Sequence, residues 1–311
     1  MKSNNMKLEF CVYIFDKEIR RVDMYLSALF KEQSRSYIQK LIEKWNVTVN
    51  GKIVSKHEKL KKWDLVEMIF DTEKSEIEAE NMALDIIYEN EDFAIISKDA
   101  GINTHPVPGE WWKSGTLVNA LLHHFDWLSV INWIERPGIV HRLDKDTTWL
   151  IIIAKNDKTM RALQIKMNKR TIKKTYLALV DWIIKESEGY IESYIWRDPQ
   201  DRKKMTVKNP INPRLAKTKF SVLKYIENKY TLAEVDLLTG RTHQIRVHFA
   251  SIGHPIVGDK TYWNEKTNKY FLEKYWLKRQ FLHSYKLAFN LDWIDYNFEA
   301  PLKNDLKNII N

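Results

Sequence analysis

Apolar residues recur every three to four positions near the start of the chain, a spacing that places them on one face of an α-helix. A first series comprises Val22, Tyr25, Leu26, Leu29 and Phe30. A second series, Ile38, Leu41 and Ile42, follows an N-cap candidate in residues 34–36. The run VTV at 47–49, the turn pair Asn50-Gly51 and Ile53 then predict a hairpin. Residues 20–70 are therefore expected to form a compact unit of two helices and a hairpin.

The pattern changes after an acidic segment, DTEKSEIEAENMALD at residues 71–85, whose weak periodicity is typical of a linker. Short apolar runs that are typical of strands follow at residues 86–88, 93–97, 150–154, 176–180 and 220–225. In residues 230–238, apolar and acidic side chains alternate, as in a half-buried strand. Helices are predicted over residues 158–167 and after Thr242, where Gly253 provides a stop.

Strands outnumber helices in this pattern and follow one another along the chain, which predicts an α+β fold with a largely antiparallel sheet. We expect three parts: an N-terminal region at residues 1–75 that contains the 20–70 unit, a linker at residues 76–85, and a main domain at residues 86–311.

Composition narrows the class of partner. The 311 residues include 50 Lys and Arg against 41 Asp and Glu, a net charge of +9, which favours nucleic acid over an anionic membrane. A lysine-rich solvated surface is the alternative. The single cysteine, Cys11, excludes a disulfide framework and a cysteine zinc site. Neither a signal peptide nor an apolar run long enough for a membrane span is found, so we expect a cytoplasmic protein.

The second predicted helix is basic. It includes Arg35, Lys40 and Lys44, and five lysines follow between residues 52 and 62. Two short helices and a hairpin with a basic surface would suit the binding of backbone phosphates. A helical face held by salt bridges explains the same residues, and the pattern alone leaves both interpretations open.

The segment HRLDKDT at residues 141–147 places two carboxylates, Asp144 and Asp146, among cationic side chains directly before a predicted strand. Three interpretations compete: surface carboxylates in a loop, two metal ligands of a nuclease, and a carboxylate that acts as a nucleophile or base. In the last case His141, Arg142 and Lys145 would keep Asp144 ionised and attract a phosphate backbone toward it.

A second group of cationic residues lies in GRTHQIRVH at residues 240–248. His243, His248 and His254 do not match a usual zinc-ligand spacing, so we expect no metal. Arg241 and Arg246 near a helix N-terminus suit phosphate better. An arginine paired with a core carboxylate is the alternative. The basic segment at residues 197–207 is expected to be a solvated turn.

These segments together resemble the signatures of the RluA-type pseudouridine synthases, and the closest likeness is to the RluD-like branch that modifies large-subunit ribosomal RNA. The matching segments are HRLDKDT with its aliphatic run and Ala154-Lys155, PGIV at 137–140, TLVNALLHH at 116–124, KTYLALV at 174–180, GRTHQIRVH at 240–248, GHPIVGD at 253–259, RQFLH at 279–283 and EAPL at 299–302. Residues 20–70 resemble the alpha-L RNA-binding module that often precedes this catalytic domain.

The resemblance implies an isomerase that detaches uracil from ribose, turns it and rejoins it through carbon five, without cofactor or metal. It implies that Asp144 is catalytic, that Tyr176 lies against the target uracil, and that Arg246 pairs with Asp144. Arg142 would fill the space that the flipped uridine leaves. His141, Lys145, Arg241 and His243 would contact RNA, as would Arg35, Lys40 and Lys44 of the module. We expect a monomer whose partner is RNA.

A non-catalytic RNA-binding or ribosome-assembly factor on the same fold is the alternative function, and a metal nuclease comes third. The presence of Asp144, Tyr176 and Arg246 disfavours an inactive protein. The sequence identifies neither the uridines that are modified nor whether Asp144 bonds to the base, bonds to the sugar or acts as a base.

Tryptophan is unusually frequent and glycine unusually rare, with 12 Trp and 9 Gly. Trp45 and Trp63 lie where a helix end and a turn call for glycine. Trp149 stands beside the catalytic segment, where a tight turn is expected. These and Trp133, Trp182, Trp196, Trp263 and Trp293 lie where the resembled family commonly has glycine; Trp111, Trp112, Trp127 and Trp276 are ambiguous. We hypothesise that the source reads UGA as glycine; the alternative is a tryptophan-rich protein that stacks on RNA bases.

Overall fold

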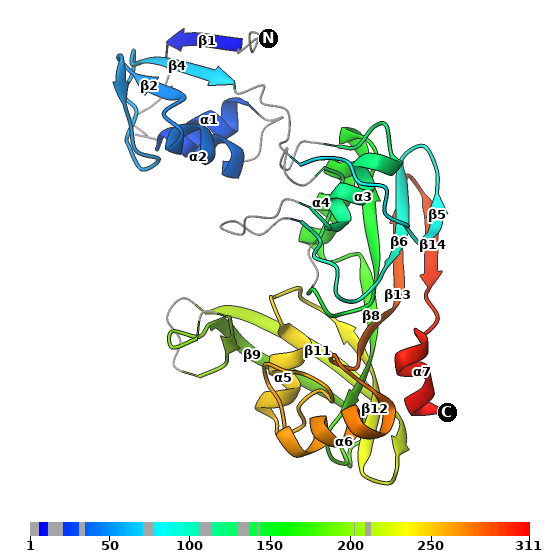
Figure 1. The fold of residues 1–311 in the computed structure, drawn as a ribbon. Helices are drawn as coiled ribbons and strands as arrows, with labels where there is room; N and C mark the ends of the chain where they lie inside the picture. The colour runs from blue at the N-terminus through cyan, green and yellow to red at the C-terminus, as the bar shows by residue number, and fades with distance from the viewer. Residues whose placement is uncertain are drawn as a thin grey trace.

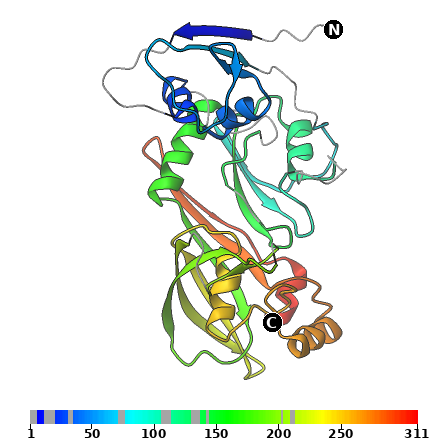
Figure 2. The same ribbon diagram turned by 90° about the vertical axis from the view of Figure 1, so that its left-hand side faces the viewer.

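The computed structural model describes residues 6–11, 21–30, 35–70, 77–105, 114–129, 137–141, 144–201, 203–208 and 213–311. Two units are visible in Figures 1 and 2: a small N-terminal module, drawn in blue, and a larger main domain. Within the described residues, no helix has the length and apolar character needed to cross a membrane. The α+β class and the largely antiparallel sheets are confirmed.

The N-terminal module packs two helices on a four-stranded antiparallel sheet. Its elements are β1 (Met6–Cys11), α1 (Val22–Leu29), α2 (Arg35–Glu43), β2 (Val47–Val49), β3 (Lys52–Ile53) and β4 (Leu65–Phe70), with strand order β1-β4-β2-β3. Leu26, Ile38 and Leu41, which the helical spacing placed on one face, are fully buried together. Asn50 and Gly51 both have positive φ, the combination that a two-residue type I′ hairpin turn requires. The predicted helices and hairpin are confirmed, whereas β1 and β4 were not predicted.

Residues 77–84, which we expected to belong to a linker, contact the main domain. Ile77 is buried in a cluster with residues of α3 (Leu117–His124), and the amide of Glu80 donates to the carbonyl of Asn119. The Asn119 side chain in turn donates to the carbonyl of Glu78. Acidic residues dominate the composition of this segment, so the few apolar side chains that anchor it were not recognised in the sequence.

The main domain contains a three-stranded and a seven-stranded sheet. The first has the order β5 (Ile86–Glu89), β6 (Phe93–Lys98), β7 (Trp149–Ala154). The second has the order β10 (Met205–Thr206), β9 (Glu188–Arg197), β11 (Arg214–Ile226), β12 (Tyr230–Leu237), β8 (Lys173–Val180), β13 (Leu282–Leu291), β14 (Ile294–Glu299). All strand pairs are antiparallel, and a bridge between Thr148 and His283 links the start of β7 to β13.

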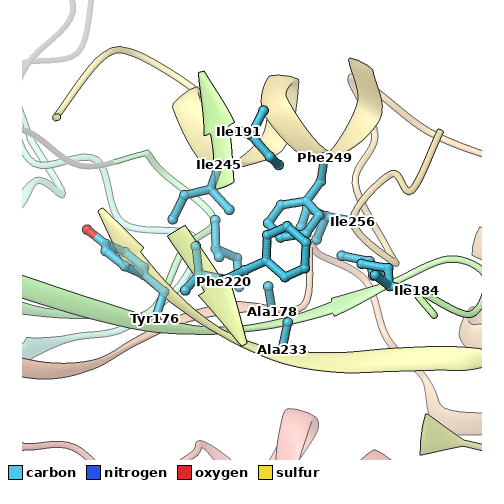
Figure 3. Packing of buried hydrophobic residues seen from close by; sticks show 12 residues of the cluster. Tyr176, Ala178, Ile184, Ile191, Phe220, Ala233, Ile245, Phe249 and Ile256 are labelled. Carbon is cyan, nitrogen blue, oxygen red and sulfur yellow. The ribbon is translucent and has the colours of Figure 1, made fainter. Parts of the chain in front are cut away.

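Helices cover both faces of the seven-stranded sheet, so β8 is buried on both sides. Ala178 and Val180 pack on one face under α5 (Gln244–Ser251), with Phe220 and Phe249 (Figure 3). Leu179 points to the opposite face, where α6 (Glu265–Tyr275) and α7 (Asn304–Ile310) supply its apolar partners. A third helix, α4 (Asp157–Lys169), packs on β7. The alternation of side chains along β8 therefore directs one set of residues to α5 and the other to α6 and α7.

Two expectations on this domain need correction. The basic segment 197–207, expected to be a solvated turn, contains the end of β9 and the short strand β10, which pair at Arg197–Met205 and Trp196–Thr206. Trp149 does not lie in a tight turn: it is the first residue of β7 and pairs with Lys98 of β6. The strand begins one residue earlier than its apolar run indicated.

Candidate active site

Asp144 lies in the loop that leads into β7, and the backbone of this loop is held from below by a buried lysine. The ammonium group of Lys98 donates to the carbonyls of Asp99, Ile102 and Lys145 at 2.7, 2.8 and 3.1 Å. Burial lowers the pKa of Lys98 to about 8, although the charges of Asp146, Asp99 and Asp144 oppose this shift. The loop is thus fixed through its main chain, which leaves the Asp144 side chain free to act.

The Asp144 carboxylate is oriented by Arg246, which α5 places opposite it. Arg246 Nη1 donates to Asp144 Oδ2 at 3.0 Å. The other nitrogens of the same guanidinium are held by Asp259, at 2.6 Å from Nε and 2.9 Å from Nη2, and by Thr261 at 2.8 Å. Burial disfavours the charge of Arg246, yet the hydrogen bonds that it donates to Asp259, together with the nearby charge of Asp144, raise its pKa above the ordinary value.

Tyr176 approaches the site from β8. It is almost fully buried, and Figure 3 shows its hydroxyl group at the edge of the apolar cluster, directed away from Phe220. Burial raises the pKa of Tyr176, the charge of Asp144 adds to this effect, and a hydrogen bond with Ser284 opposes it. The phenol is therefore neutral at physiological pH.

These three side chains share one open pocket of about 580 Å³. Asp144, Tyr176 and Arg246 line it together with His141 and His243, and the lining extends along the end of α4 and the loop before α5. Among the described residues that line the pocket, Asp144 is the one carboxylate. A single carboxylate beside a buried phenol and an arginine suits nucleophilic or proton-transfer chemistry.

The two histidines that we expected to contact RNA have different positions. Nε2 of His141 accepts a hydrogen bond from the backbone of Ile152 at 3.3 Å, and burial, helped by the charge of Lys174, lowers the pKa of His141 to about 3. His243 lies closer to the carboxylate, with Nε2 3.9 Å from Asp144 Oδ1. Burial lowers its pKa as well. Both are therefore neutral, and His141 supports the strand rather than supplying charge.

Of the remaining predicted contacts in this domain, Lys145 is exposed beside Asp144, and Arg241 lines the pocket with its Nε donating to the carbonyl of Leu215. Arg142 lies outside the described residues. These positions bring Arg241 to the pocket and Lys145 to its surroundings, and RNA contact by either stays a prediction.

In the module, Arg35 is engaged in a structural ion pair: its Nη2 lies 2.9 Å from Oδ2 of the buried Asp23. Lys40 is half-buried on α2, and Lys44 is exposed just beyond it. The interpretation of a helical face held by salt bridges therefore applies to Arg35, whose guanidinium nevertheless stays 48% exposed.

The structure also identifies site residues that the sequence pattern did not single out. Asp259 and Lys98 fix Arg246 and the catalytic loop, respectively. Asp259 ends the segment GHPIVGD, which was noted only for its resemblance. A buried arginine requires an acidic partner, and this requirement is the signal that could have identified Asp259. Among the described residues, no group of histidine, cysteine and acidic side chains could hold a metal ion.

Comparisons with known proteins agree with this geometry. The sequence profile described as RNA pseudouridylate synthase matches residues 92–251, and that of the S4 domain matches residues 20–66. An uncharacterized RNA pseudouridine synthase of Aquifex aeolicus (strain VF5) is 45% identical over 82% of this chain and 79% of its own. The ribosomal large subunit pseudouridine synthase D of Neisseria meningitidis (serogroup A, strain Z2491) is 36% identical over 94% of this chain and 78% of its own.

Among solved structures, human RNA pseudouridylate synthase domain containing 1 superposes with a TM-score of 0.58 at 26% identity, covering 72% of this chain and 85% of its own. The fold and the arrangement of the main domain are therefore shared with proteins of this kind.

Proposed function

The chain belongs to the RNA pseudouridylate synthase family and is an RNA pseudouridine synthase with an S4 domain, and we propose that it isomerises specific uridines of large-subunit ribosomal RNA through Asp144. The observation that supports this role most directly is the position of the Asp144 carboxylate. One oxygen is oriented by Arg246, and the side chain lines the pocket. The name of the Neisseria relative supports the choice of ribosomal RNA.

The reaction conserves all atoms of the uridine. The bond between C1′ and N1 breaks, uracil turns in the pocket, a bond between C1′ and C5 forms, and the proton leaves C5 while N1 gains one. Asp144 supports the first step, because a carboxylate either stabilises positive charge at C1′ while the bond to N1 breaks, or attacks C1′ as uracil leaves and is itself displaced when C5 bonds to C1′. Arg246 holds this carboxylate in place.

Tyr176 supports the last step as a relay. Since its phenol stays neutral, it can take the proton from C5 only while its own hydroxyl proton passes to an acceptor, and N1 of the turned uracil is the atom that gains a proton in the overall reaction. A buried tyrosine also offers an apolar ring face to a uracil that has left the RNA stack.

The proposal is tested by mapping pseudouridines in ribosomal RNA from cells with and without the gene, using carbodiimide treatment and primer extension. We expect one or more large-subunit sites to disappear with the gene and to return with the wild-type copy but not with Asp144→Asn. Full restoration by Asp144→Asn would exclude Asp144 chemistry. An unchanged large-subunit map would exclude this substrate.

The non-catalytic alternative makes a different prediction for the same strains. An assembly factor would leave the pseudouridine map unchanged and alter the accumulation of ribosomal subunits, and Asp144→Asn would then restore growth as well as the wild-type gene does.

A further inference from the structure

Arginines gather at the mouth of the pocket, beyond the residues that carry the chemistry. Arg170 and Arg241 both line the pocket, and the Nε of Arg241 donates to the carbonyl of Leu215, the residue after Arg214 at the start of β11. In agreement with this arrangement, burial lowers the pKa of Arg241, and the positive charges of Arg214 and Arg170 lower it further. Like charges held together without a counter-ion lower the stability of the folded chain, so the cluster calls for a ligand.

Within the described part of the chain, no ion pair joins Arg170, Arg214 or Arg241 to a carboxylate. Other cations near the same strands are paired: Lys217 contacts Glu192 at 3.0 Å, and Lys219 contacts Glu188 at 3.3 Å. The chain thus neutralises the cations along β9 and β11 and leaves those at the pocket mouth uncompensated.

Lys174 extends this cluster toward the catalytic residues. It is half-buried on β8, two residues before Tyr176, and its ammonium group lies 3.9 Å from the sulfur of Met167. Its neighbour Thr175, on the opposite face, instead donates to Asp236. The alternation of β8 therefore places the cation on the pocket side and the acidic partner on the other side.

Arg170 has a backbone conformation that favours glycine although it carries a long side chain, which indicates that the side chain has a function. It follows α4 with φ +59°, and its amide donates to the carbonyl of Met167 as in a glycine-type helix end. A residue that adopts an unfavourable backbone conformation without improving the packing is expected at functional positions.

Resting on the proposed function, we propose that Arg170, Lys174, Arg214 and Arg241 form a phosphate-binding subsite that holds the RNA backbone next to the flipped uridine. Guanidinium groups bind phosphate oxygens in pairs, and an open mouth accepts a strand rather than a small anion. The subsite would orient the strand, while Asp144 and Tyr176 act on the base.

The test compares the double variant Arg170→Gln/Arg214→Gln with Arg161→Gln, which alters an exposed arginine on the same helix away from the pocket. Binding of a labelled RNA stem-loop is measured over a series of salt concentrations. We expect the double variant to lower the salt slope by about 0.7 for each lost phosphate contact and to raise KM by about tenfold. Its kcat should stay within about twofold of the wild-type value.

An unchanged slope and KM in the double variant, or an equal change in Arg161→Gln, would overturn the subsite. A wild-type protein that forms no pseudouridine would overturn the proposed function instead, because the salt slope is a binding measurement and does not depend on catalysis.

A separate observation concerns the tryptophans. Eleven non-glycine residues in the described part of the chain have positive φ, and five of them are Trp45, Trp63, Trp182, Trp276 and Trp293. This conformation is natural for glycine, tolerated by asparagine and aspartate, and a genuine outlier for a bulky side chain. All five indoles are at least half exposed, from 50% at Trp182 to 96% at Trp293, so burial of the side chain does little to offset the strained backbone.

Four of the five sites are helix ends or tight turns that favour glycine. Trp45 lies just past α2, where its amide donates to Ile42 and that of Asn46 donates to Leu41, the hydrogen bonds of a Schellman motif. Trp276 holds the equivalent left-handed position after α6. Asp292 and Trp293 both have positive φ in the tight turn between β13 and β14, where Asp-Gly is the preferred pair.

Trp63 completes the set. The amide of Asp64 donates to the carbonyl of Lys61, and the positive φ falls on the third residue of this turn, where a type II turn requires glycine. The five sites are distributed over the module and the main domain, so a shared RNA-stacking surface does not account for them. Trp149 and Trp196 lie in strands, and this backbone argument does not extend to them.

We infer that these five residues are glycine in the protein that the source organism makes, because its ribosomes read UGA as glycine where the printed sequence has tryptophan. Genetic codes that translate UGA as tryptophan would turn such codons into Trp throughout the sequence. The scarcity of glycine, 9 residues against 12 Trp, has the same explanation.

The deciding measurement is the mass of peptides from the protein purified from its natural host, together with the codons at the five positions. UGA codons and glycine masses are expected. UGG codons or tryptophan masses would overturn the inference.

A second measurement tests the backbone argument in recombinant protein. The fivefold Trp→Gly variant should melt several degrees above the matched fivefold Trp→Ala variant, because alanine removes the same indoles but keeps a β-carbon at positive φ. Equal melting temperatures would contradict the assignment of these sites as glycine positions.

Discussion

Two carboxylates, one in each domain, show how this chain separates structural from chemical use of the same group. Asp23 in the N-terminal module is fully buried, and its oxygens accept hydrogen bonds from Arg21, Arg35 and Gln39. Asp144 at the pocket is 22% exposed, and Arg246 supplies its one short hydrogen bond from a side chain within the described residues. Asp23 has its acceptor positions filled, whereas Asp144 keeps Oδ1 available for a substrate.

Asp259 shows that the difference lies in the surroundings and not in the domain. It is fully buried and shares the partner Arg246 with Asp144, and its oxygens also accept from the amides of Thr261 and Tyr262. Filled acceptors therefore mark Asp23 and Asp259 as parts of the scaffold. The available oxygen of Asp144 supports the proposal that it is the reacting group.

The largest expected effect separates Asp259 from Asp144. Asp259→Asn removes the buried charge that pairs with Nε and Nη2 of Arg246 and should lower the free energy of unfolding of the main domain by about 3–5 kcal/mol. Asp144→Asn should lower it by less than about 1 kcal/mol, because that group is partly solvated. Calorimetric unfolding of both variants measures the difference, and equal destabilisation would remove the distinction between scaffold and reacting carboxylate.

Tyr176→Phe tests whether the phenol hydroxyl takes part in the reaction. The ring stays and the hydroxyl is lost, so kcat should fall by about 10²-fold, while the Kd for RNA changes by less than about twofold. Single-turnover rates and RNA binding are measured on the same preparation. Wild-type turnover would exclude the phenol from proton transfer, and lost binding would reassign it to substrate positioning.

Asp23→Asn addresses the scaffold carboxylate of the module. Its removal should destabilise the module by about 1–3 kcal/mol, less than for Asp259, because Arg21 and Arg35 are partly exposed and can turn to water. The calorimetric transition of the main domain should not move. Lys56→Gln, which removes an exposed ion pair of the same module with Glu43, is the control and should have a negligible effect.

The smallest effect is a difference in the response of the two domains to acid. Burial lowers the pKa of His248 to about 4, so below its ordinary value of 6.5 the unfolded chain binds a proton that the folded chain excludes. The main domain should therefore lose stability as the pH falls from about 6.5 toward 4.

The module should respond at lower pH. Burial alone would raise the pKa of Asp23, but hydrogen bonds from Gln39, Arg35 and Arg21 lower it to about 2. The stability that this group contributes is complete above about pH 4 and is lost as the pH falls toward 2. Melting temperatures at a series of pH values measure both domains. His248→Gln should weaken the loss of main-domain stability in acid without abolishing it, because burial also lowers the pKa of His141. The response of the module should not change, and a change there would contradict the assignment.

Sequence periodicity predicted the elements whose burial alternates cleanly. The helix α4 and the strand β12 were identified from spacing alone, and β12 indeed buries Ala233 and Val235 while Asp236 is exposed. The strand β9 was missed because its exposed Tyr190 and Tyr194 stand next to the buried Ile191 and Ile195, so apolar and polar side chains do not alternate along it. Periodicity fails where a strand shows an aromatic face to solvent.

The candidate site was predictable only in part for a related reason. The charge around Asp144 was visible in the sequence, yet charge alone left three interpretations open until the resemblance to a family was used. The hydrogen bond from Arg246 joins residues 102 positions apart, and the supports from Asp259 and Lys98 are equally absent from any local pattern. Such pairings depend on topology, which brings α5 over β8 beside the loop before β7.

The link between Thr148 and His283 has a consequence for the order of events during synthesis. Thr148 Oγ1 lies 2.8 Å from His283 Nδ1, and Gln280 donates to Thr147, so the segment that follows Asp144 is anchored to residues more than 130 positions downstream. A chain emerging from the ribosome presents Asp144 long before Arg246 and β13 exist to position it. We therefore expect the nascent protein to become active only after its C-terminal quarter has been made.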